Sequence, residues 1–208
     1  MSISKKDAEI QAKKIVNNVV KHNNLLSELL KGVVSKKDSI RYPNTLALEI
    51  LSEKNPEIVY PQWNAFVNLL KSKNAYHKSI GISVISNLTQ IDKEKKFEEI
   101  FEDFFKLIDD GSVIVSRKLS IYSGRIGKAK PSLGSRIATV LLSIDDTQHS
   151  ESRKDLIKGD IIVSLSEIFE NIKDKAKILQ FVKNQLDSSS PSTVMKAKEF
   201  LSKLEIPS

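Results

Sequence analysis

The stretch FEEIFEDFFKLIDDGSVIVSRKLSIYSGRIGK, residues 97–128, indicates the expected fold more clearly than any other part of this chain. At the α-helical step of 100° per residue, seven apolar residues of its first half fall within an arc of about 160°, namely Phe97, Ile100, Phe101, Phe104, Phe105, Leu107 and Ile108. An apolar face this wide must pack against more than one neighbouring element. The stretch therefore predicts one helix of a larger helical assembly.

The turn Asp109-Asp110-Gly111 is predicted to end this helix, and Ser112 to begin a second one. We expect Gly111 to adopt the left-handed conformation that often follows a helix. We also expect the Ser112 side chain to accept a backbone N–H from the first turn of the second helix. The inward stripe of that helix is predicted to comprise Val115, Leu119, Tyr122 and Ile126.

Four cations gather on one side of the second predicted helix. On the same helical wheel, Lys128 lies about 20°, Arg125 about 80° and Lys118 about 100° from Arg117. The segment from Ser112 to Ile144 contains six lysines or arginines and no acidic residue. We call Arg117, Lys118, Arg125 and Lys128 the basic stripe, and it is the first candidate binding surface.

Apolar residues at helical spacing recur along the rest of the chain, and no stretch alternates as a β-strand does. The expected elements are an N-terminal helix at residues 4–21 and two-helix units at about 23–54, 58–90, 93–128, 131–172 and 175–205. Pro43 is expected near the first turn of a helix, where its missing N–H costs nothing. The pattern predicts an all-α protein with a single domain, residues 1–208.

Composition narrows the class of protein further. The 208 residues are 40% hydrophobic and 28% charged, which is ordinary for a globular protein. The sequence has no cysteine, which excludes disulfides, thiolate metal sites and cysteine nucleophiles. No signal-peptide core and no apolar run of about 18 residues is present, so we expect a cytoplasmic protein without a membrane partner. A net charge of +7 favours acidic partners or simply solubility.

Pairs of large apolar residues recur in alternate predicted helices at steps of 40, 38, 34 and 40 residues. They are Leu29-Leu30, Leu69-Leu70, Leu107-Ile108, Leu141-Leu142 and Phe181-Val182. A period near 40 with two helices in each unit is typical of HEAT and armadillo repeats.

The chain resembles the HEAT-repeat family at these residues and at Asp110-Gly111-Ser112-Val113, which is followed by Arg117. The resemblance implies a right-handed α-solenoid of about five repeats, with the second helix of each repeat on the concave side. It would place the basic stripe on or near that concave surface.

Two interpretations of the basic stripe follow from the residues. Its cations could meet nucleic-acid phosphates or an acidic protein partner. Alternatively, Arg117 pairs with acids of adjacent repeats in a ladder of ion pairs, while Lys128 and Lys130 are only solvated.

Four further residues are candidates for binding. Lys158 falls inside the apolar arc of its helix, so either its amino group reaches Asp155 or Asp160, or Gly159 locally distorts the helix. Lys158 and Asp160 either form part of a polar pocket beside Arg117 or make an ion pair between repeats. Trp63 and Tyr76 flank one predicted hairpin and could anchor a peptide, although packing between helices is the more common role of such residues.

Catalytic chemistry has little support in the sequence. It contains no phosphate-binding glycine loop, no HExxH and no GxSxG motif, and no cofactor or small-molecule substrate is implied. His22, His77 and His149 lack metal-ligand spacing and are expected at the surface or at helix caps. HEAT-like DNA glycosylases are similar in size and basicity, but none of their site residues can be transferred to this chain.

These observations predict a non-catalytic scaffold that binds a protein partner along a concave face. The alternative is a nucleic-acid-binding protein, with a glycosylase-like role as one form of it. The basic stripe, Lys158, Asp160, Trp63 and Tyr76 are the residues expected to bind.

Overall fold

The computed structural model describes residues 3–204, and about 85% of these residues are helical, with no strand among them. This confirms the all-α prediction. The chain divides into two compact units, Met1–Lys93 and Glu94–Ser208, which we describe separately. The limits of the predicted single domain, residues 1 and 208, and the end of the last predicted repeat at residue 205 lie outside the described residues.

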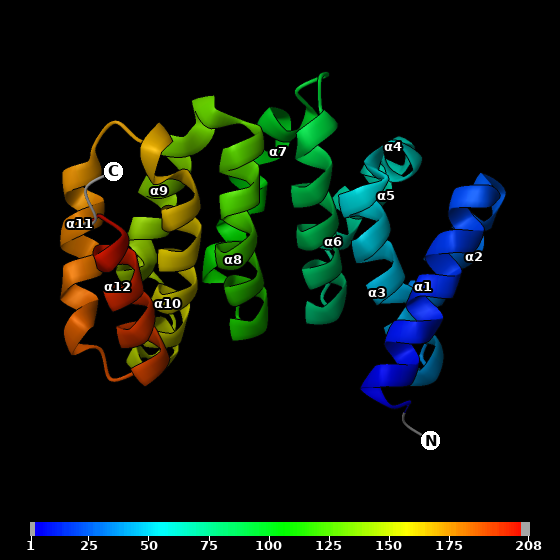
Figure 1. Cartoon of the computed structure of the whole chain (residues 1–208), viewed down its shortest axis with the longest axis horizontal. Helices are drawn as coiled ribbons and strands as arrows, with labels where there is room; N and C mark the ends of the chain where they lie inside the picture. Colours follow the sequence, from blue (N-terminus) through cyan, green and yellow to red (C-terminus); the bar gives the residue numbers. More distant parts are fainter. Residues whose placement is uncertain (1–2, 205–208) are drawn as a thin grey trace. The chain divides into compact units, whose positions relative to one another are not determined.

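The N-terminal unit is built on α3, which contacts α1, α2 and α6 (Figure 1). Its helices are α1 (Lys5–Lys21), α2 (Leu26–Val33), α3 (Asp38–Lys54), α4 (Pro56–Val59), α5 (Trp63–Leu70) and α6 (Ala75–Leu88). Ser4 caps α1 by accepting the N–H of Asp7, and the Asn74 side chain caps α6 by accepting the N–H of Tyr76. The α5 helix packs along α6, and the long helices α3 and α6 also contact each other.

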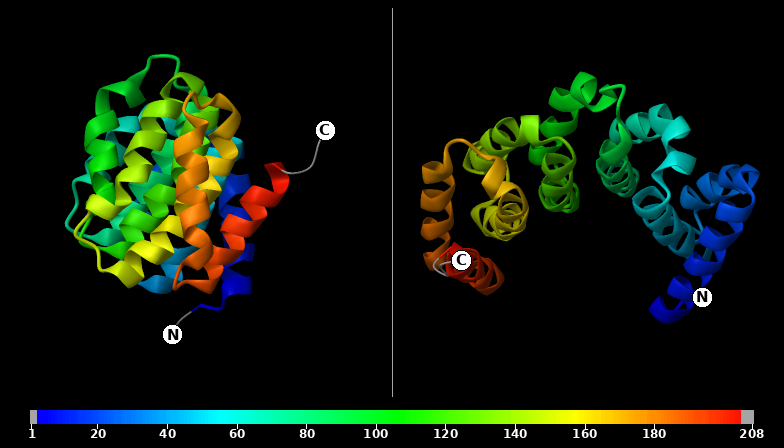
Figure 2. Two further views of the ribbon diagram at one scale, coloured as in Figure 1. Left: turned by 90° about the vertical axis from the view of Figure 1, so that its left-hand side faces the viewer. Right: turned by 45° about the horizontal axis from the view of Figure 1, so that its top comes forward.

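The C-terminal unit is built on α10, which contacts α8 on one side and α12 on the other. Its helices are α7 (Lys96–Phe105), α8 (Val113–Ala129), α9 (Gly134–Leu142), α10 (Glu151–Ile168), α11 (Lys175–Asn184) and α12 (Pro191–Leu204). Figure 2 shows α10, α11 and α12, coloured yellow to red, as neighbouring helices in both of its views.

The apolar arc read from residues 97–108 forms the aromatic core of the C-terminal unit. Phe97, Phe101, Phe104 and Phe105 are each at most 2% exposed. Their rings meet mainly edge to face, with centroids 5.2 Å apart for Phe97 and Phe104 and 5.4 Å apart for Phe104 and Phe105. Aromatic pairs in this geometry stabilise a core beyond the effect of burial alone.

The prediction for the turn before α8 was wrong in two details. Gly111, like every other described glycine, lacks a positive φ. The chain leaves α7 through a short 3-10 turn that ends at Asp109. Ser112 precedes α8, but its side chain makes no capping hydrogen bond. Instead, Asp110 is extended (φ −65°, ψ 141°), and its Oδ1 accepts the N–H of Ser112 at 2.9 Å. An aspartate side chain that bonds the backbone two residues on makes this turn without a left-handed glycine.

Pro43 lies inside α3, not in the first turn as expected. The helix begins earlier, at Asp38, where a negative side chain interacts favourably with the helix N-terminus. Side chains donate to the carbonyls around the proline: Asn44 Nδ2 to Ile40 at 2.7 Å and Thr45 Oγ1 to Arg41 at 3.0 Å. The carbonyl that loses its usual donor to the proline is that of Ser39, so these two bonds go to the carbonyls that follow it.

Candidate binding surface

The C-terminal unit presents a surface formed by α8, α10 and α12. The helices α8 and α10 are in contact along their length, and α12 contacts α10 on its other side (Figure 1). Most of the predicted binding residues lie on these helices. We call this the α8/α10/α12 surface.

A row of three charged side chains crosses the α8/α10/α12 surface. Arg117 of α8 donates from Nε to Asp160 Oδ2 at 2.6 Å and from Nη2 to Asp160 Oδ1 at 3.4 Å. Lys196 of α12 donates from Nζ to Asp160 Oδ1 at 2.9 Å. The Asp160 side chain is only 1% exposed, so these two cations replace its lost hydration. We call this row the Arg117–Asp160–Lys196 ladder.

The ladder also changes the protonation equilibrium of its arginine. The hydrogen bond to Asp160 raises the pKa of Arg117 above its ordinary value, and the attraction between the two charges adds to this effect, although burial opposes it. Because the folded-state pKa is raised, the stabilisation is fully present at neutral pH. It is lost only as the pH rises through the arginine's own titration, in strongly alkaline solution.

Close approach of α10 and α12 allows Asp160 to reach Lys196. A Cβ on Gly159 would lie 2.6 Å from Thr193 Oγ1, so only glycine leaves room for α12 at this point. Thr193 Oγ1 in turn donates to the carbonyl of Asp155 at 2.6 Å. The glycine that interrupts the helical pattern therefore sets the helix spacing on which the ladder depends.

The acidic partners expected for Lys158 were wrong. Lys158 Nζ lies 2.7 Å from Asp145 Oδ1 and does not pair with Asp155 or Asp160. Lys154 Nζ also reaches this segment, donating to the Asp145 carbonyl at 2.8 Å. Both lysines are nearly buried and secure the turn before α10, because their helix positions face that turn and not the ladder.

The other residues of the basic stripe also have contacts within the protein. The Lys118 amino group lies 4.6 Å, and the Arg125 guanidinium 4.8 Å, from the centre of the Tyr122 ring. Lys128 Nζ lies 3.6 Å from Glu167 Oε2 of α10. Tyr122 is only half-buried, which corrects its predicted place in the inward stripe.

Lys130 is buried, whereas one of the two interpretations above expected it to be solvated. Its side chain is 8% exposed, and its Nζ donates to Glu98 Oε2 of α7 at 2.8 Å. The lysine ends α8, where a cation also interacts favourably with the helix C-terminus. It therefore ties the two helices of this hairpin together.

The structure does not bring Trp63 and Tyr76 of the N-terminal unit together as one exposed anchor. Trp63 is 3% exposed, with its ring centroid 5.7 Å from that of Tyr60. Tyr76 is half-buried; its hydroxyl bonds that of Thr45, and the Arg41 guanidinium lies 4.8 Å from the centre of its ring. Trp63 packs between helices, which is the alternative interpretation given for it above.

The three histidines differ in environment. His22 is exposed, and His77 is half-buried, with Nδ1 3.2 Å from Ser72 Oγ. His149 is 7% exposed, so of the two expected positions it is not at the surface, and its Nε2 lies 2.9 Å from Ser116 Oγ and 3.2 Å from the Ile108 carbonyl. Among the described residues, no group of three or more His, Asp or Glu side chains is arranged to hold a metal ion.

Sequence reasoning missed several exposed apolar residues of α8, α10 and α12, three of which lie close in sequence to the ladder residues. Ile114 is 64% exposed, Leu156 42% and Met195 61%. Ile114 and Leu156 lie one turn before Arg117 and Asp160 in their helices, and Met195 directly precedes Lys196. A signal was present in the sequence, because Ile114 lies about 60° from Arg117 on the helical wheel, inside the arc of the basic stripe.

No family model, curated protein or solved structure matches this chain. Between residues 3 and 204, no helix combines the length and apolar character needed to cross a membrane. Conclusions about function therefore rest on the geometry above.

Proposed function

We propose that this protein is a non-catalytic scaffold, built as a HEAT-like α-solenoid, that binds a protein partner on the α8/α10/α12 surface. Successive helix pairs support the architecture: α2 with α3, α5 with α6, α7 with α8, α9 with α10, and α11 with α12. The Arg117–Asp160–Lys196 ladder supports it as well, because it links the second helices of three consecutive pairs. The absence of cysteine favours a reducing compartment such as the cytoplasm.

The observation that favours a protein partner is the combination of exposed apolar residues and paired charged residues on one surface. Ile114, Leu156 and Met195 are exposed there, while Arg117 pairs with Asp160 and Lys128 with Glu167. Apolar anchors surrounded by polar residues are typical of protein interfaces. Phosphate binding instead requires cations whose charge is not already neutralised by neighbouring carboxylates.

A site-specific photo-crosslinking experiment tests this proposal. A photoreactive amino acid is placed at Ile114 or Met195, and at Lys183, an exposed control position on α11. In an extract of the source cells, we expect the same discrete cross-linked protein from Ile114 and Met195 and none from Lys183. The double substitution Ile114→Asp/Met195→Asp should abolish cross-linking from a probe at Leu156.

Two results would count against a protein partner on this surface. Cross-links of equal yield at Lys183 would mean that contact is unspecific. A cross-linked species that disappears on nuclease treatment would assign the surface to a nucleic acid.

A nucleic-acid-binding function is the second candidate, and the charge of the N-terminal unit favours it. Residues 1–93 contain 14 lysines and arginines and eight acidic residues, a net charge of +6, whereas residues 94–208 contain 19 and 18, a net charge of +1. A salt series of fluorescence anisotropy with labelled duplex and single-stranded DNA tests this candidate. Binding through phosphates should weaken steeply with salt, and tight binding would justify testing damaged bases as glycosylase substrates.

The structure changes which variants suit that DNA experiment. Arg117→Glu would place a second carboxylate beside the buried Asp160, so lost binding would not be distinguishable from damage to the fold. Lys6→Glu/Lys13→Glu is better, because both lysines are exposed on α1. Neither makes an ion pair with any described residue.

A further inference from the structure

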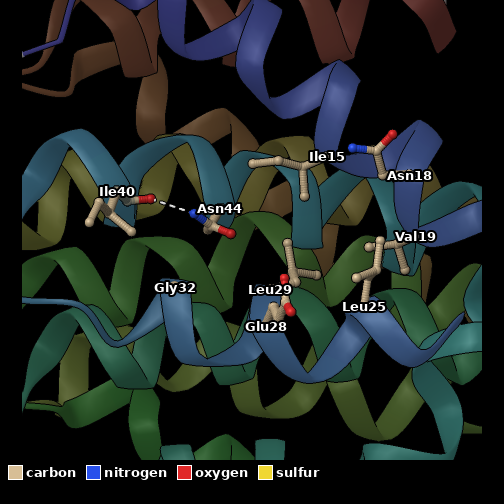
Figure 3. Close-up of a pocket in the computed structure, with 9 residues that line it drawn as sticks. All are labelled: Ile15, Asn18, Val19, Leu25, Glu28, Leu29, Gly32, Ile40 and Asn44. Carbon is tan, nitrogen blue, oxygen red and sulfur yellow. Dashed lines mark hydrogen bonds between the residues drawn. The ribbon is translucent and has the colours of Figure 1, made fainter. Parts of the chain in front are cut away.

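A groove lies between α1 and α2 in the N-terminal unit. The two helices both pack on α3, and the space between them has a volume of about 320 Å³. Figure 3 shows that side chains of all three helices surround it. Its lining comprises Ile15, Asn18 and Val19 of α1, Leu25, Glu28, Leu29 and Gly32 at and along α2, and Ile40 and Asn44 of α3.

The lining is mainly apolar and has the length of a short helical contact. Leu25, Leu29 and Gly32 follow each other at spacings of four and three residues, which is about 10 Å along a helix axis. Gly32 lets the Asn44 side chain lie against α2, since a Cβ there would be 2.4 Å from Asn44 Cγ. In a partner helix, apolar residues at i, i+4 and i+7 cover the same length along the helix axis.

Exposed lysines lie at the edges of the groove. On α1, Lys14 and Lys21 are four residues before and three residues after Asn18, so they share its side of the helix. On α2, Lys31 is three residues after Glu28. Among the described residues, none of these three lysines has an acidic side chain within 4 Å, whereas the ladder cations of α8 and α12 do. The groove thus has a mainly apolar lining, in which Glu28 is the one acidic residue, and exposed lysines at its edges.

We infer that this groove binds an acidic amphipathic helix of a partner protein. Its apolar residues would enter between α1 and α2, and its carboxylates would face Lys14, Lys21 and Lys31. Charge complementarity selects this occupant, because the lining offers apolar contacts that nucleic-acid phosphates would leave unused, and the edges repel a basic helix. This inference concerns the N-terminal unit and stands independently of the α8/α10/α12 surface.

Designed helical peptides test the inference on the full chain. The probes are fluorescein-labelled peptides with Leu at i, i+4, i+7 and i+11 and Glu at the flanking positions. A second series carries Lys at those flanks, and a third is a scrambled acidic series of the same composition. By fluorescence anisotropy, we expect the acidic amphipathic peptide to bind at least about tenfold more tightly than the other two.

Two matched charge variants locate the site on one helix. Lys14→Glu/Lys21→Glu should weaken binding of the acidic peptide about tenfold, since attraction at the groove edge becomes repulsion. Lys6→Glu/Lys13→Glu makes the same change in net charge on the side of α1 turned away from the groove and should change binding less than about twofold. A third variant, Asn18→Trp, fills the groove from an exposed position and should abolish binding.

Several outcomes would overturn the inference. Equal weakening by the two charge variants would show diffuse electrostatic attraction, and equal binding of the scrambled peptide would show that no helix is recognised. If no peptide binds at about 100 μM, the groove is not a peptide site. If anionic phospholipid vesicles bind where the peptides do not, and Asn18→Trp abolishes this vesicle binding, the groove contacts a membrane surface.

Discussion

Removing both cations of the Arg117–Asp160–Lys196 ladder should destabilise the fold far more than removing either one. In the native protein, Asp160 is 1% exposed and is held by Arg117 at 2.6 Å and by Lys196 at 2.9 Å. Methionine at positions 117 and 196 would keep an unbranched apolar stem at each position and remove the charge. The double variant would then leave a buried carboxylate with neither cation.

The magnitudes follow from burial and hydrogen bonding. Arg117 has a side chain 43% exposed, so solvent screens part of its attraction, and we expect Arg117→Met alone to cost about 1.5 kcal/mol, the low end for a hydrogen bond to a charged group. Arg117→Met/Lys196→Met should cost about 3–5 kcal/mol, because a buried charge then lacks compensation. Adding Asp160→Leu should recover most of this loss, since no buried charge remains.

Urea unfolding followed by far-UV circular dichroism measures these free energies, and a double-mutant cycle measures the coupling between Arg117 and Lys196. Glu199→Ala is the matched control, because its ion pair with Lys203 lies at the surface of α12, both side chains being 62% exposed. That control should cost less than about 0.5 kcal/mol. The reasoning is refuted if the double variant unfolds as easily as the control, or if the triple variant is no more stable than the double.

Two further sets of variants test packing and ion pairing within the C-terminal unit by the same urea measurement. Lys130→Met should cost about 1–2 kcal/mol, because it removes a buried cation from Glu98, which can partly turn to solvent; no loss would mean that this pair does not stabilise the hairpin. Gly127→Ala should destabilise by about 1 kcal/mol or more, because its Cβ would lie 2.6 Å from Ile168 Cγ2 and overpacking outweighs the helix propensity of alanine. Gly111→Ala is its control and should be neutral or stabilising by up to about 1 kcal/mol, since nothing lies within 4 Å of the added Cβ; equal effects at both glycines would contradict this packing argument.

Helix positions could be predicted because they depend on neighbours in the sequence. The apolar period of residues 97–108 places the Phe97 to Phe105 cluster in the core, as the structure confirms. Turn details were less predictable, since several local solutions compete. The chain uses an extended Asp110 where a left-handed glycine was expected, and the one described non-glycine residue with a positive φ is Lys95, before α7.

The candidate surface was only partly predictable. Helical spacing correctly put Arg117 and Lys128 on one side of α8, and an ion pair of Arg117 with a neighbouring helix was one of the two interpretations. The sequence also contained the signal for Ile114, an apolar residue within a basic arc, but its 64% exposure depends on which helices cover α8. Exposure is a property of the packed protein and not of a single helix.

By itself, the sequence determined that this chain is helical, where most helices lie and which of their faces are apolar, because side-chain periodicity acts within a few residues. Which charges meet depends instead on how the helices pack. Lys158 reaches Asp145, 13 residues away, while Asp160 lies between Arg117 and Lys196, 43 and 36 residues away. Such pairs form where helix packing removes a carboxylate from water, and that packing depends on close approaches such as the one at Gly159, which local sequence patterns do not encode.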